Sequence, residues 1–451
     1  MRAIRTLILI FFLTFTLFVA WGQFPDQQYV ISGVDSLEKY IETKTNIKFD
    51  YASNSIVLED DATDGQFILQ PFSFEESFNE GLPSWNGLAP EDENSAFKVQ
   101  MRFETSRGWS DWVTVGYWDK HIWSWYGDTE FQGGKVNIDV VKLNEYINNY
   151  QFKVQLKRNS LSYQSPGIEQ LSFFVSDSKT TDNVDISDIV ADNPPKIFIK
   201  TDFIYQITVD DEIGSLICSP TSTSMIIRSY DIEVDPYDFA LRTYDPEWEL
   251  FGVWPRAVQH AHEYGLQGSV TRYRTWSEAY EVLNNGGRIA MSVGRPLYAG
   301  HLMMLAGFDS NGNPIVHDPA KSSGYGKIYY KKDLTESWFN KGGISYTFYP
   351  KESPTAVAGN ELSRINNISV YPNPVADRIN MELNFQKNEK LSVRIFDLNG
   401  RCIDVLCNET VLPKGNHVMT FKINQKKYTP GIYLLHVVTG SKHYKEKIVK
   451  Q

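Results

Sequence analysis

Cys218 lies at the predicted first turn of a helix, a position that favours a reactive thiol. Cys218 is followed by Pro220 and then by hydroxyl and apolar residues up to Ile227. Proline suits the first turn of a helix because its missing N–H would have no partner there, so the pattern predicts a helix that begins at Cys218. The positive end of the helix dipole would lower the pKa of this thiol and favour the nucleophilic thiolate. The alternative is an inert cysteine that packs as a small apolar side chain.

A thiolate nucleophile needs a base and a group that orients the base. His301 opens an apolar strand, a turn follows at 309–313, and the returning strand leads to Asp318. Both residues then lie at the open end of one hairpin, and they face the same side if the loop holds an even number of residues, for example 310–313. His301 would take the thiol proton while Asp318 fixes its tautomer. The alternative for His301 is a hydrogen-bonded core residue, and the combination of Cys, His and Asp favours catalysis.

The oxyanion of a tetrahedral intermediate also needs hydrogen-bond donors. Gln206, twelve residues before Cys218, is the candidate side chain, and the backbone N–H of Cys218 is the second donor. Because glutamine is common on protein surfaces, a solvated side chain is the alternative for Gln206.

Other histidines and acids fit these roles less well. His317 points to the other face of a regular strand, and Asp309 lies in the turn, at the wrong end of the hairpin. His260 and His262 lie about 200° apart around a predicted helix, 254–265, so they cannot share a metal ion there, although they could on a strand. We therefore expect neither a metal site nor an organic cofactor.

The candidate residues lie in a segment that mixes helix and strand patterns, whereas the segments before and after it show strand patterns only. Apolar and polar residues alternate at 97–104 and at 152–157, which is typical of half-buried strands. Polar stretches separate the three segments. We expect a multidomain chain: signal peptide 1–22, all-β sandwich accessory domain 23–178, linker 179–197, α+β domain 198–350, linker 351–365 and a small all-β sandwich 366–451.

The N-terminus predicts export. Arg2 and Arg5 precede an apolar run, 7–20, and small residues follow at Ala20 and Gly22, which is typical of a cleaved signal peptide. The run of about 14 residues is shorter than the roughly 20 that a membrane span requires, and an uncleaved anchor is the alternative. The net charge of −11 disfavours a nucleic-acid partner. Three cysteines are an odd number, so at least one thiol is unpaired or pairs between chains.

Six of the eleven tryptophans fall within one stretch of the first β segment. Aromatic rings at the rim of a sandwich can stack on sugar rings or peptides, so a carbohydrate or peptide ligand is one hypothesis. Packing in the core and turns is the other, and the large area that a tryptophan buries favours it. The six are Trp85, Trp109, Trp112, Trp118, Trp123 and Trp125.

The segment from Asp202 to Ala320 resembles the papain-like peptidases related to bacteriocin-processing, double-glycine leader peptidases. The resemblance implies Cys218 as nucleophile, His301 as general base and acid, Asp318 as orienter and Gln206 in the oxyanion hole. Bacteriocin-processing members are fused to an ATP-driven exporter, which this chain lacks, so cleavage of a double-glycine leader is not implied. The matching pieces are Gln206, Cys218-Ser219-Pro220-Thr221-Ser222, Met225, Gly300-His301, Gly307-Phe308-Asp309 and Asp318-Pro319-Ala320.

The C-terminal segment is similar to the sorting domain of type IX secretion in Bacteroidetes. This resemblance implies passage across the outer membrane by the type IX machinery, followed by release or surface attachment. The first β segment resembles β-rich N-terminal halves found beside such peptidase domains in secreted bacterial proteins, through Pro83-Ser84-Trp85-Asn86 and Trp109-Ser110-Asp111-Trp112. The sorting-domain pieces are Ser369-Val370-Tyr371-Pro372-Asn373-Pro374, Val393-Arg394-Ile395-Phe396-Asp397-Leu398-Asn399-Gly400 and Gly431-Ile432-Tyr433-Leu434.

The sequence thus predicts a secreted or surface-attached cysteine peptidase that cleaves a peptide or protein substrate through a thioester acyl-enzyme. One alternative keeps the same groups but acts on a non-peptide amide, as an amidohydrolase or acyl transferase. The other is a surface binding protein with an inactive papain-like domain, whose tryptophan-rich sandwich binds the ligand.

Overall fold

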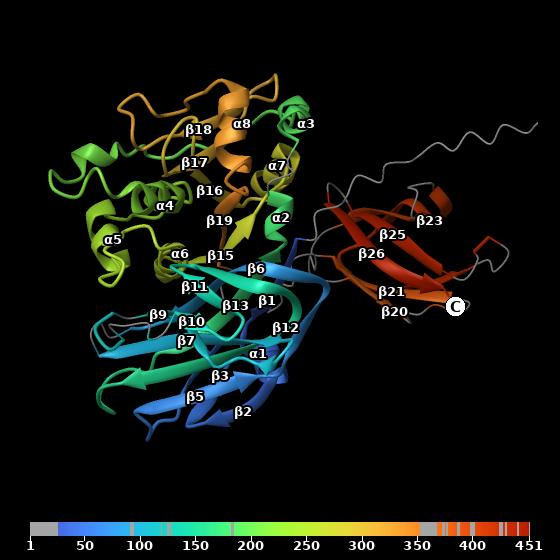
Figure 1. Cartoon of the computed structure of the whole chain (residues 1–451). Coiled ribbons are helices and arrows are strands. Elements are labelled where there is room, and N and C mark those ends of the chain that lie inside the picture. The colour runs from blue at the N-terminus through green and yellow to red at the C-terminus, as the bar shows by residue number, and fades with distance from the viewer. Residues whose placement is uncertain are drawn as a thin grey trace, which may run out of the picture.

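The computed structural model describes residues 26–351, apart from gaps at 91–93, 119, 124–126, 128 and 182–184, and the strands and some adjoining residues between 368 and 450 (Figure 1). The predicted signal peptide and all but the first residue of the second predicted linker lie outside the described residues. Within the described residues, no helix is both long enough and apolar enough to cross a bilayer.

The first part, which we call the β-rich unit, is a network of thirteen hydrogen-bonded strands with one short helix. Its elements are β1 (Gln27–Ser32), α1 (Val34–Lys39), β2 (Ile41–Thr45), β3 (Ile47–Asp50), β4 (Ser55–Leu58), β5 (Asp64–Leu69), β6 (Phe72–Leu88), β7 (Ser95–Thr105), β8 (Gly108–Trp109), β9 (Val113–Trp118), β10 (Glu130–Phe131), β11 (Gly134–Asn137), β12 (Val140–Arg158) and β13 (Gly167–Ser176).

Alternation along the chain explains these strands. Phe97, Val99 and Met101 of β7 are fully buried, while Lys98 and Gln100 between them are partly exposed. The first half of the long strand β12 pairs with β6, and its second half pairs with β7 and β5. Both groups of strands contribute to one hydrophobic core, so the two layers of this predicted sandwich are joined through β12.

The second part, which we call the α+β unit, follows without a long break. Its elements are α2 (Ser178–Thr181), α3 (Ile186–Ala191), β14 (Ile197–Phe198), η1 (Gln206–Thr208), α4 (Cys218–Arg228), α5 (Pro236–Thr243), α6 (Trp254–Glu263), β15 (Leu266–Arg272), α7 (Trp276–Asn284), β16 (Arg288–Val293), β17 (His301–Phe308), β18 (Pro314–His317), α8 (Lys331–Phe339) and β19 (Ile344–Pro350).

The sheet of this unit has the order β14-β17-β16-β19-β15, with β18 beside β17, and helices cover both faces. Leu302 and Met304 of β17 share a core with α4 and α6, whereas Met303 and Leu305 pack with Trp276 of α7 and with α8. The unbroken apolar run of β17 is therefore the pattern of a strand buried on both faces.

The segment predicted as a linker, 179–197, contains structure of its own. Asp185 caps α3 by accepting hydrogen bonds from the backbone N–H groups of Ser187 and Asp188. Ile189 is buried in the core that α7 and α8 share. Lys331 at the start of α8 donates to the carbonyl of Asp192. The acidic segment 179–197 therefore contains a capped helix, α3, that packs against the α+β unit.

Side chains of the β-rich unit cap the free edge of strand β15. The Gly268 N–H donates to Asn86 Oδ1 at 3.0 Å, and the Val270 N–H donates to Ser84 Oγ at 3.0 Å. Gln170 Nε2 donates to the Gly268 carbonyl at 2.8 Å. An uncovered edge strand is open to pairing with other chains, so these buried polar side chains complete the sheet.

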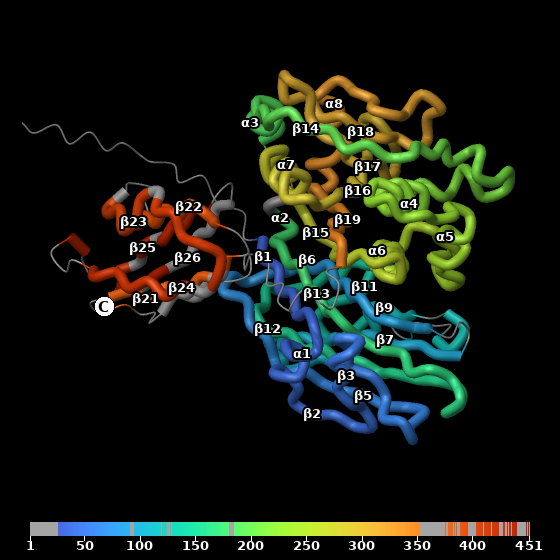
Figure 2. The backbone as a smooth tube through the Cα atoms, turned by 180° about the vertical axis from the view of Figure 1, so that it is seen from behind, coloured from blue at the N-terminus to red at the C-terminus, as the bar shows by residue number. Residues whose placement is uncertain are grey.

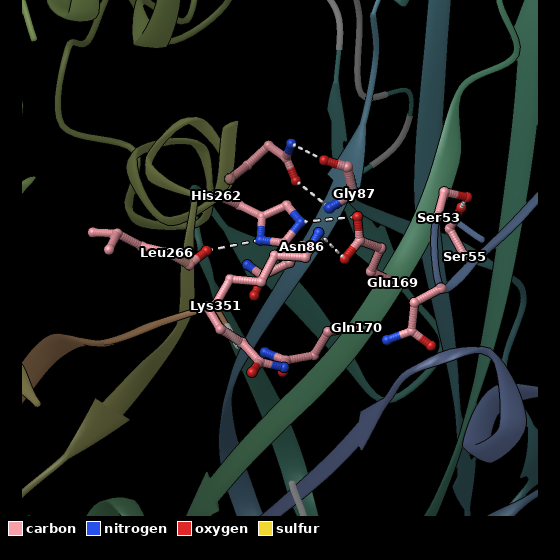
Figure 3. A network of polar contacts seen from close by, with 12 residues as sticks. Ser53, Ser55, Asn86, Gly87, Glu169, Gln170, His262, Leu266 and Lys351 are labelled. Carbon is pink, nitrogen blue, oxygen red and sulfur yellow. Dashed lines mark hydrogen bonds and ion pairs between the residues drawn. The ribbon is translucent and has the colours of Figure 1, made fainter. Parts of the chain in front are cut away.

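Buried charges reinforce the same contact. Glu169 of β13 lies 3.2 Å from His262 Nε2 and 2.6 Å from Lys351 Nζ. Burial raises the pKa of Glu169, but the contacts with His262 and Lys351 outweigh it and leave the pKa below its usual value. Gln259 of α6 exchanges two hydrogen bonds with the backbone of Gly87, at 2.8 and 2.9 Å (Figure 3). The β-rich and α+β units therefore share a polar interface of hydrogen bonds and buried ion pairs.

Among the described residues of the last part, the C-terminal unit, all the regular elements are β-strands. This unit is the orange-to-red part of the tube in Figure 2. A three-stranded and a four-stranded sheet enclose one core that includes Cys407, whose thiol is free. The strands are β20 (Ile368–Tyr371), β21 (Arg378–Phe385), β22 (Glu389–Phe396), β23 (Cys402–Leu412), β24 (Gly415–Lys422), β25 (Gly431–Thr439) and β26 (Lys442–Lys450).

Candidate active site

Helix α4 begins at Cys218, as the position of Pro220 predicts. Cys218 is partly buried and carries a free thiol, which makes a hydrogen-bond contact with the imidazole of His301. The side chain thus stands at the N-terminus of the helix and against the start of β17. Burial raises the pKa of this thiol, but the His301 contact and the backbone N–H groups of Leu302 and Ser219 outweigh it, so the pKa lies below its usual value.

His301 and Asp318 lie on the same face of the hairpin for a reason that the sequence did not reveal. The loop holds five residues, 309–313, because Phe308 pairs with Pro314. This odd number would place the two side chains on opposite faces. A bulge at Ala306, between the pairs of Leu305 and Gly307, adds one residue and restores the register. The prediction of a loop with an even number of residues was wrong. The bulge at Ala306 instead places His301 and Asp318 on the same face.

The His301 imidazole and the Asp318 carboxylate form a short ion pair, with Nε2 of the ring 2.8 Å from Oδ1. This contact leaves the other ring nitrogen, Nδ1, available to Cys218. Both side chains are almost fully buried, with exposures of 5% for His301 and 0% for Asp318. The three side chains therefore form a continuous row from the first residue of α4 to the residue that follows β18.

Four donors hold the Asp318 carboxylate. Oδ1 accepts from His301 and from the Ala320 N–H at 3.0 Å, while Oδ2 accepts from the hydroxyls of Tyr298, at 2.6 Å, and Tyr329. Burial raises the pKa of Asp318, but the hydrogen bonds from His301, Tyr298 and Tyr329 outweigh it and lower the pKa to about 2. Asp318 is therefore a fixed anion over the whole physiological range.

The charge of His301 follows from its two neighbours. Burial alone would lower its pKa, but the hydrogen bonds to Asp318 and Cys218 raise the pKa to about 9. With the pKa of Cys218 lowered at the same time, the thiolate–imidazolium form is favoured. Such a pair is the reactive form of a cysteine nucleophile.

Tyr298 and Tyr329 are site residues that sequence reasoning missed. Besides donating to Asp318, Tyr298 lies over the imidazole, with ring centroids 4.3 Å apart. The two hydroxyls are 3.2 Å from each other. A tyrosine three residues before His301 is the only local signal, and the position of Tyr329 depends on the loop after Asp318.

Gln206 is buried at the start of η1 and lies beside the segment that follows Asp318. Its backbone N–H donates to the carbonyl of Pro319 at 2.9 Å, and its Nε2 donates to the carbonyl of Gly214 at 2.8 Å. Only one of the two N–H bonds of Nε2 is needed for that contact. The surface alternative for Gln206 is wrong, since its exposure is 3%, and its role at an oxyanion stays a prediction.

The other histidines and Asp309 take structural positions. His317 is buried on the opposite face and its Nε2 contacts the carbonyl of Ile199 at 2.9 Å. Asp309 accepts from two N–H groups within the turn. His260 lies 2.8 Å from Glu263, and His262 contacts the β-rich unit. Among the described residues, no group of three His, Cys, Asp or Glu is placed to hold a metal ion.

The tryptophan-rich stretch divides between core and surface. Trp85 and Trp118 are fully buried, and Trp118 Nε1 donates to Glu263 of α6 at 2.7 Å. The rings of Trp109 and Trp112 lie beneath the guanidinium of Arg102, at 4.9 and 4.7 Å from the ring centres. Trp123 lies beneath Lys98 in the same way, and Trp125 is outside the described residues. These contacts favour packing, and a carbohydrate or peptide ligand stays a prediction.

The β-rich unit also reaches the neighbourhood of the site. Its buried residue Asp139 accepts a hydrogen bond from the Trp254 N–H at the start of α6, at 3.0 Å. Burial raises the pKa of Asp139 to about 7, against a smaller opposing effect of Lys341. Tyr346 of β19 bonds Ser219, the residue after Cys218, at 2.8 Å, and interacts electrostatically with both Asp139 and Cys218.

Comparison with protein families gives three matches. Residues 198–346 match the Peptidase C39 like family, residues 369–451 match the secretion system C-terminal sorting domain, and residues 56–176 match the Peptidase C39 N-terminal domain. The two resemblances seen in the peptidase segment and the tail are therefore confirmed. The chain carries a C39-like peptidase domain, which includes Cys218, His301 and Asp318, and a C-terminal sorting domain.

Among solved structures, the chain is similar to a double glycine motif protease from an AMS/PCAT transporter in complex with its leader peptide, at 19% identity and a TM-score of 0.26, over 34% of this chain and 94% of that one. It is also similar to latent PorU from Porphyromonas gingivalis, at 11% identity and a TM-score of 0.18, over 94% of this chain and 34% of that one. No curated protein matches the chain. Because these TM-scores are low, the domain assignments depend on the family models.

Proposed function

We propose that the protein is an exported cysteine peptidase in which Cys218 is the nucleophile, His301 the general base and acid, and Asp318 the orienter of His301. The observation that carries the proposal is the row of contacts from Cys218 to His301 to Asp318. The match of residues 198–346 to the C39-like family supports the same reaction class.

In the first half of the proposed reaction, the thiolate of Cys218 attacks the carbonyl carbon of a peptide bond. A C–S bond forms and the carbonyl oxygen takes up negative charge, which the N–H of Cys218 and Nε2 of Gln206 would stabilise. The C–N bond then breaks as the imidazolium of His301 gives its proton to the leaving amine. The product is a thioester with Cys218.

In the second half, His301 takes a proton from water, and the resulting hydroxide attacks the thioester carbonyl. The C–S bond breaks, the carboxylic acid leaves and the thiolate–imidazolium pair is restored. Asp318 keeps its charge throughout, because its pKa of about 2 is far below that of His301. Its role is to hold the ring and to stabilise the imidazolium.

The match of residues 369–451 supports transport of the enzyme to the cell surface or the medium by the type IX secretion machinery. Its substrate would then be a peptide or protein outside the cell. The family of the peptidase segment favours peptide hydrolysis over transfer to another acceptor.

Alkylation of the purified protein by iodoacetamide, with the adduct located by mass spectrometry, tests the pair. We expect fast labelling of Cys218 at pH 6, where an ordinary thiol of pKa near 8.5 reacts slowly. His301→Ala should reduce the rate at pH 6 by about 100-fold. Labelling of Cys218 only above pH 8, or a rate unaffected by His301→Ala, would contradict the proposal. Buried Cys407 is the internal control, because it should stay unlabelled in the folded protein.

A further inference from the structure

Lys341 follows helix α8 and reaches back to the start of β17. Its Nζ lies 3.5 Å from the carbonyl of Val293, the residue that pairs with His301 across the sheet. The same atom lies 4.0 Å from the point that a Cβ on Gly300 would occupy, and Gly300 directly precedes His301. The ammonium group therefore lies beside the residue that pairs with His301 and beside the residue that precedes it.

This ammonium group has unused hydrogen-bonding capacity. The Val293 contact is long for a hydrogen bond, and a lysine carries three donors. Among the described residues, no carboxylate oxygen forms an ion pair with Lys341 within 4.0 Å. The side chain is half-buried, so it lacks part of the hydration that an exposed lysine enjoys. A partly desolvated cation without a close partner favours the binding of an anion.

Burial lowers the pKa of Lys341 below its usual value, and the neighbouring Cys218 and Asp139 oppose this shift only in part. Asp139 accepts a hydrogen bond from the Trp254 N–H, and it forms no ion pair with Nζ of Lys341. The β-rich unit thus contributes, through Asp139, to the electrostatics beside the candidate nucleophile.

We propose that Lys341 is a specificity-determining residue that binds a carboxylate of the substrate next to the scissile bond. In peptides this anion is either an Asp or Glu side chain or the C-terminal carboxylate. The inference rests on the proposed function, because it places the carboxylate beside the acyl group that Cys218 attacks. A half-buried ammonium group attracts a carboxylate in direct contact much more strongly than it attracts a neutral amide. Lys341 would therefore select substrates that carry a carboxylate at this position.

Two alkylating reagents of nearly equal size test the proposal. Iodoacetate carries a carboxylate and iodoacetamide a neutral amide, and each alkylates a thiolate with loss of iodide. We expect the ratio of the two rates at Cys218 to exceed that of free cysteine by roughly tenfold at low salt and to fall as salt is added. Lys341→Met should remove the excess, and Lys341→Arg should retain most of it. Lys332→Met is the matched control, since Lys332 is exposed on α8 and pairs with Glu336.

The outcomes separate the two proposals. If both reagents label Cys218 quickly at pH 6 and Lys341→Met leaves their ratio unchanged, the carboxylate site is wrong while the nucleophile stands. An equal loss of both rates in Lys341→Met would assign Lys341 to stabilising the thiolate, and it would also overturn the carboxylate site. Slow labelling by both reagents in the unaltered protein would contradict the assignment of Cys218 as the nucleophile, and the carboxylate site would fall with it.

The source of the carboxylate can be distinguished by competition. Pools of hexapeptides with a fixed central Glu or Gln, each with an amidated or a free C-terminus, would be tested for protection of Cys218 against iodoacetamide. Protection by both Glu pools but neither Gln pool assigns a side-chain carboxylate, and protection by both free-ended pools but neither amidated pool assigns the C-terminus. Equal protection by all four pools would contradict the proposal.

Discussion

The hydroxyl of Tyr298 donates a 2.6 Å hydrogen bond to Oδ2 of Asp318, the carboxylate whose other oxygen contacts His301. Its ring also lies 4.3 Å from the imidazole, centre to centre. Tyr298 therefore holds both partners of the His–Asp pair at once. We therefore classify Tyr298 as a positioning residue, which acts on the reaction through His301 and Asp318.

Removing this hydroxyl should slow the reaction without weakening substrate binding. In Tyr298→Phe we expect kcat to fall by about tenfold with little change in KM, because a hydrogen bond to a charged group contributes about 1.5–3 kcal/mol. Steady-state kinetics on a peptide substrate would measure the two constants. Tyr280→Phe is the control, since the Tyr280 hydroxyl has only a long, exposed contact with Asn284. A rise in KM with unchanged kcat would show that Tyr298 binds substrate instead.

The charge of His301 predicts an alkaline limit to activity. Because its pKa is raised to about 9, the imidazolium that protonates the leaving amine is lost as the pH rises through about 9, and catalysis should decline there. Alkylation by neutral iodoacetamide should not decline, because Cys218 stays a thiolate. The raised pKa also means that the stabilisation from His301 is complete below its ordinary pKa of about 6.5 and disappears as the pH passes about 9. The lowered pKa of Asp318 has the opposite effect, since its stabilisation is lost only as the pH falls through about 2.

Hydrolysis rates, iodoacetamide alkylation rates and thermal midpoints between pH 5 and 10 would measure these limits. In His301→Ala, alkylation at pH 5–7 should become slow and should rise with pH toward the pKa of an ordinary thiol, near 8.5. The same steep rise between pH 5 and 8 in the unaltered protein would indicate an ordinary thiol and contradict the ion pair.

Gly307 should tolerate no side chain. Its φ is +143°, and an added Cβ would lie 2.0 Å from the carbonyl oxygen of Ile197. We therefore expect Gly307→Ala to reduce the free energy of unfolding by about 3 kcal/mol or more and to slow alkylation of Cys218, because the bulge sets the face of His301. Denaturant unfolding would measure the loss. Gly286→Ala is the control: Gly286 also has a positive φ but open space, so its cost should be about 1 kcal/mol. If both variants lost the same free energy of unfolding, the close contact of Gly307 with Ile197 would not explain the loss.

The cap on strand β15 should contribute measurably to stability. Ser84→Ala removes the acceptor of the Val270 N–H in a fully buried interface, which should cost about 1–3 kcal/mol. It should also speed proteolysis between the β-rich and α+β units. Ser73→Ala, at an exposed position of the same strand β6, should change stability by less than about 0.5 kcal/mol. If the two variants were equally stable, the contact between the units would be weaker than the hydrogen bonds imply.

Patterns along the chain predict the helix and the hairpin of the site and its Cys, His and Asp residues. Pro220 marks the start of the helix at Cys218, and the apolar run from His301 followed by turn residues marks the hairpin, because both patterns depend on neighbours along the chain. The alternation in β7 likewise identifies a half-buried strand. These features follow from local backbone preferences and from the periodicity of burial.

Contacts between distant segments set which side chains meet. His301 and Asp318 share a face because Ala306 adds a residue to β17, and next to this bulge Gly307 packs closely against Ile197, more than a hundred residues away. The meeting of Tyr329 with Asp318 and the capping of β15 by Ser84 are equally non-local. Strand register and packing depend on contacts between distant segments, so they cannot be predicted from the periodicity of a single segment.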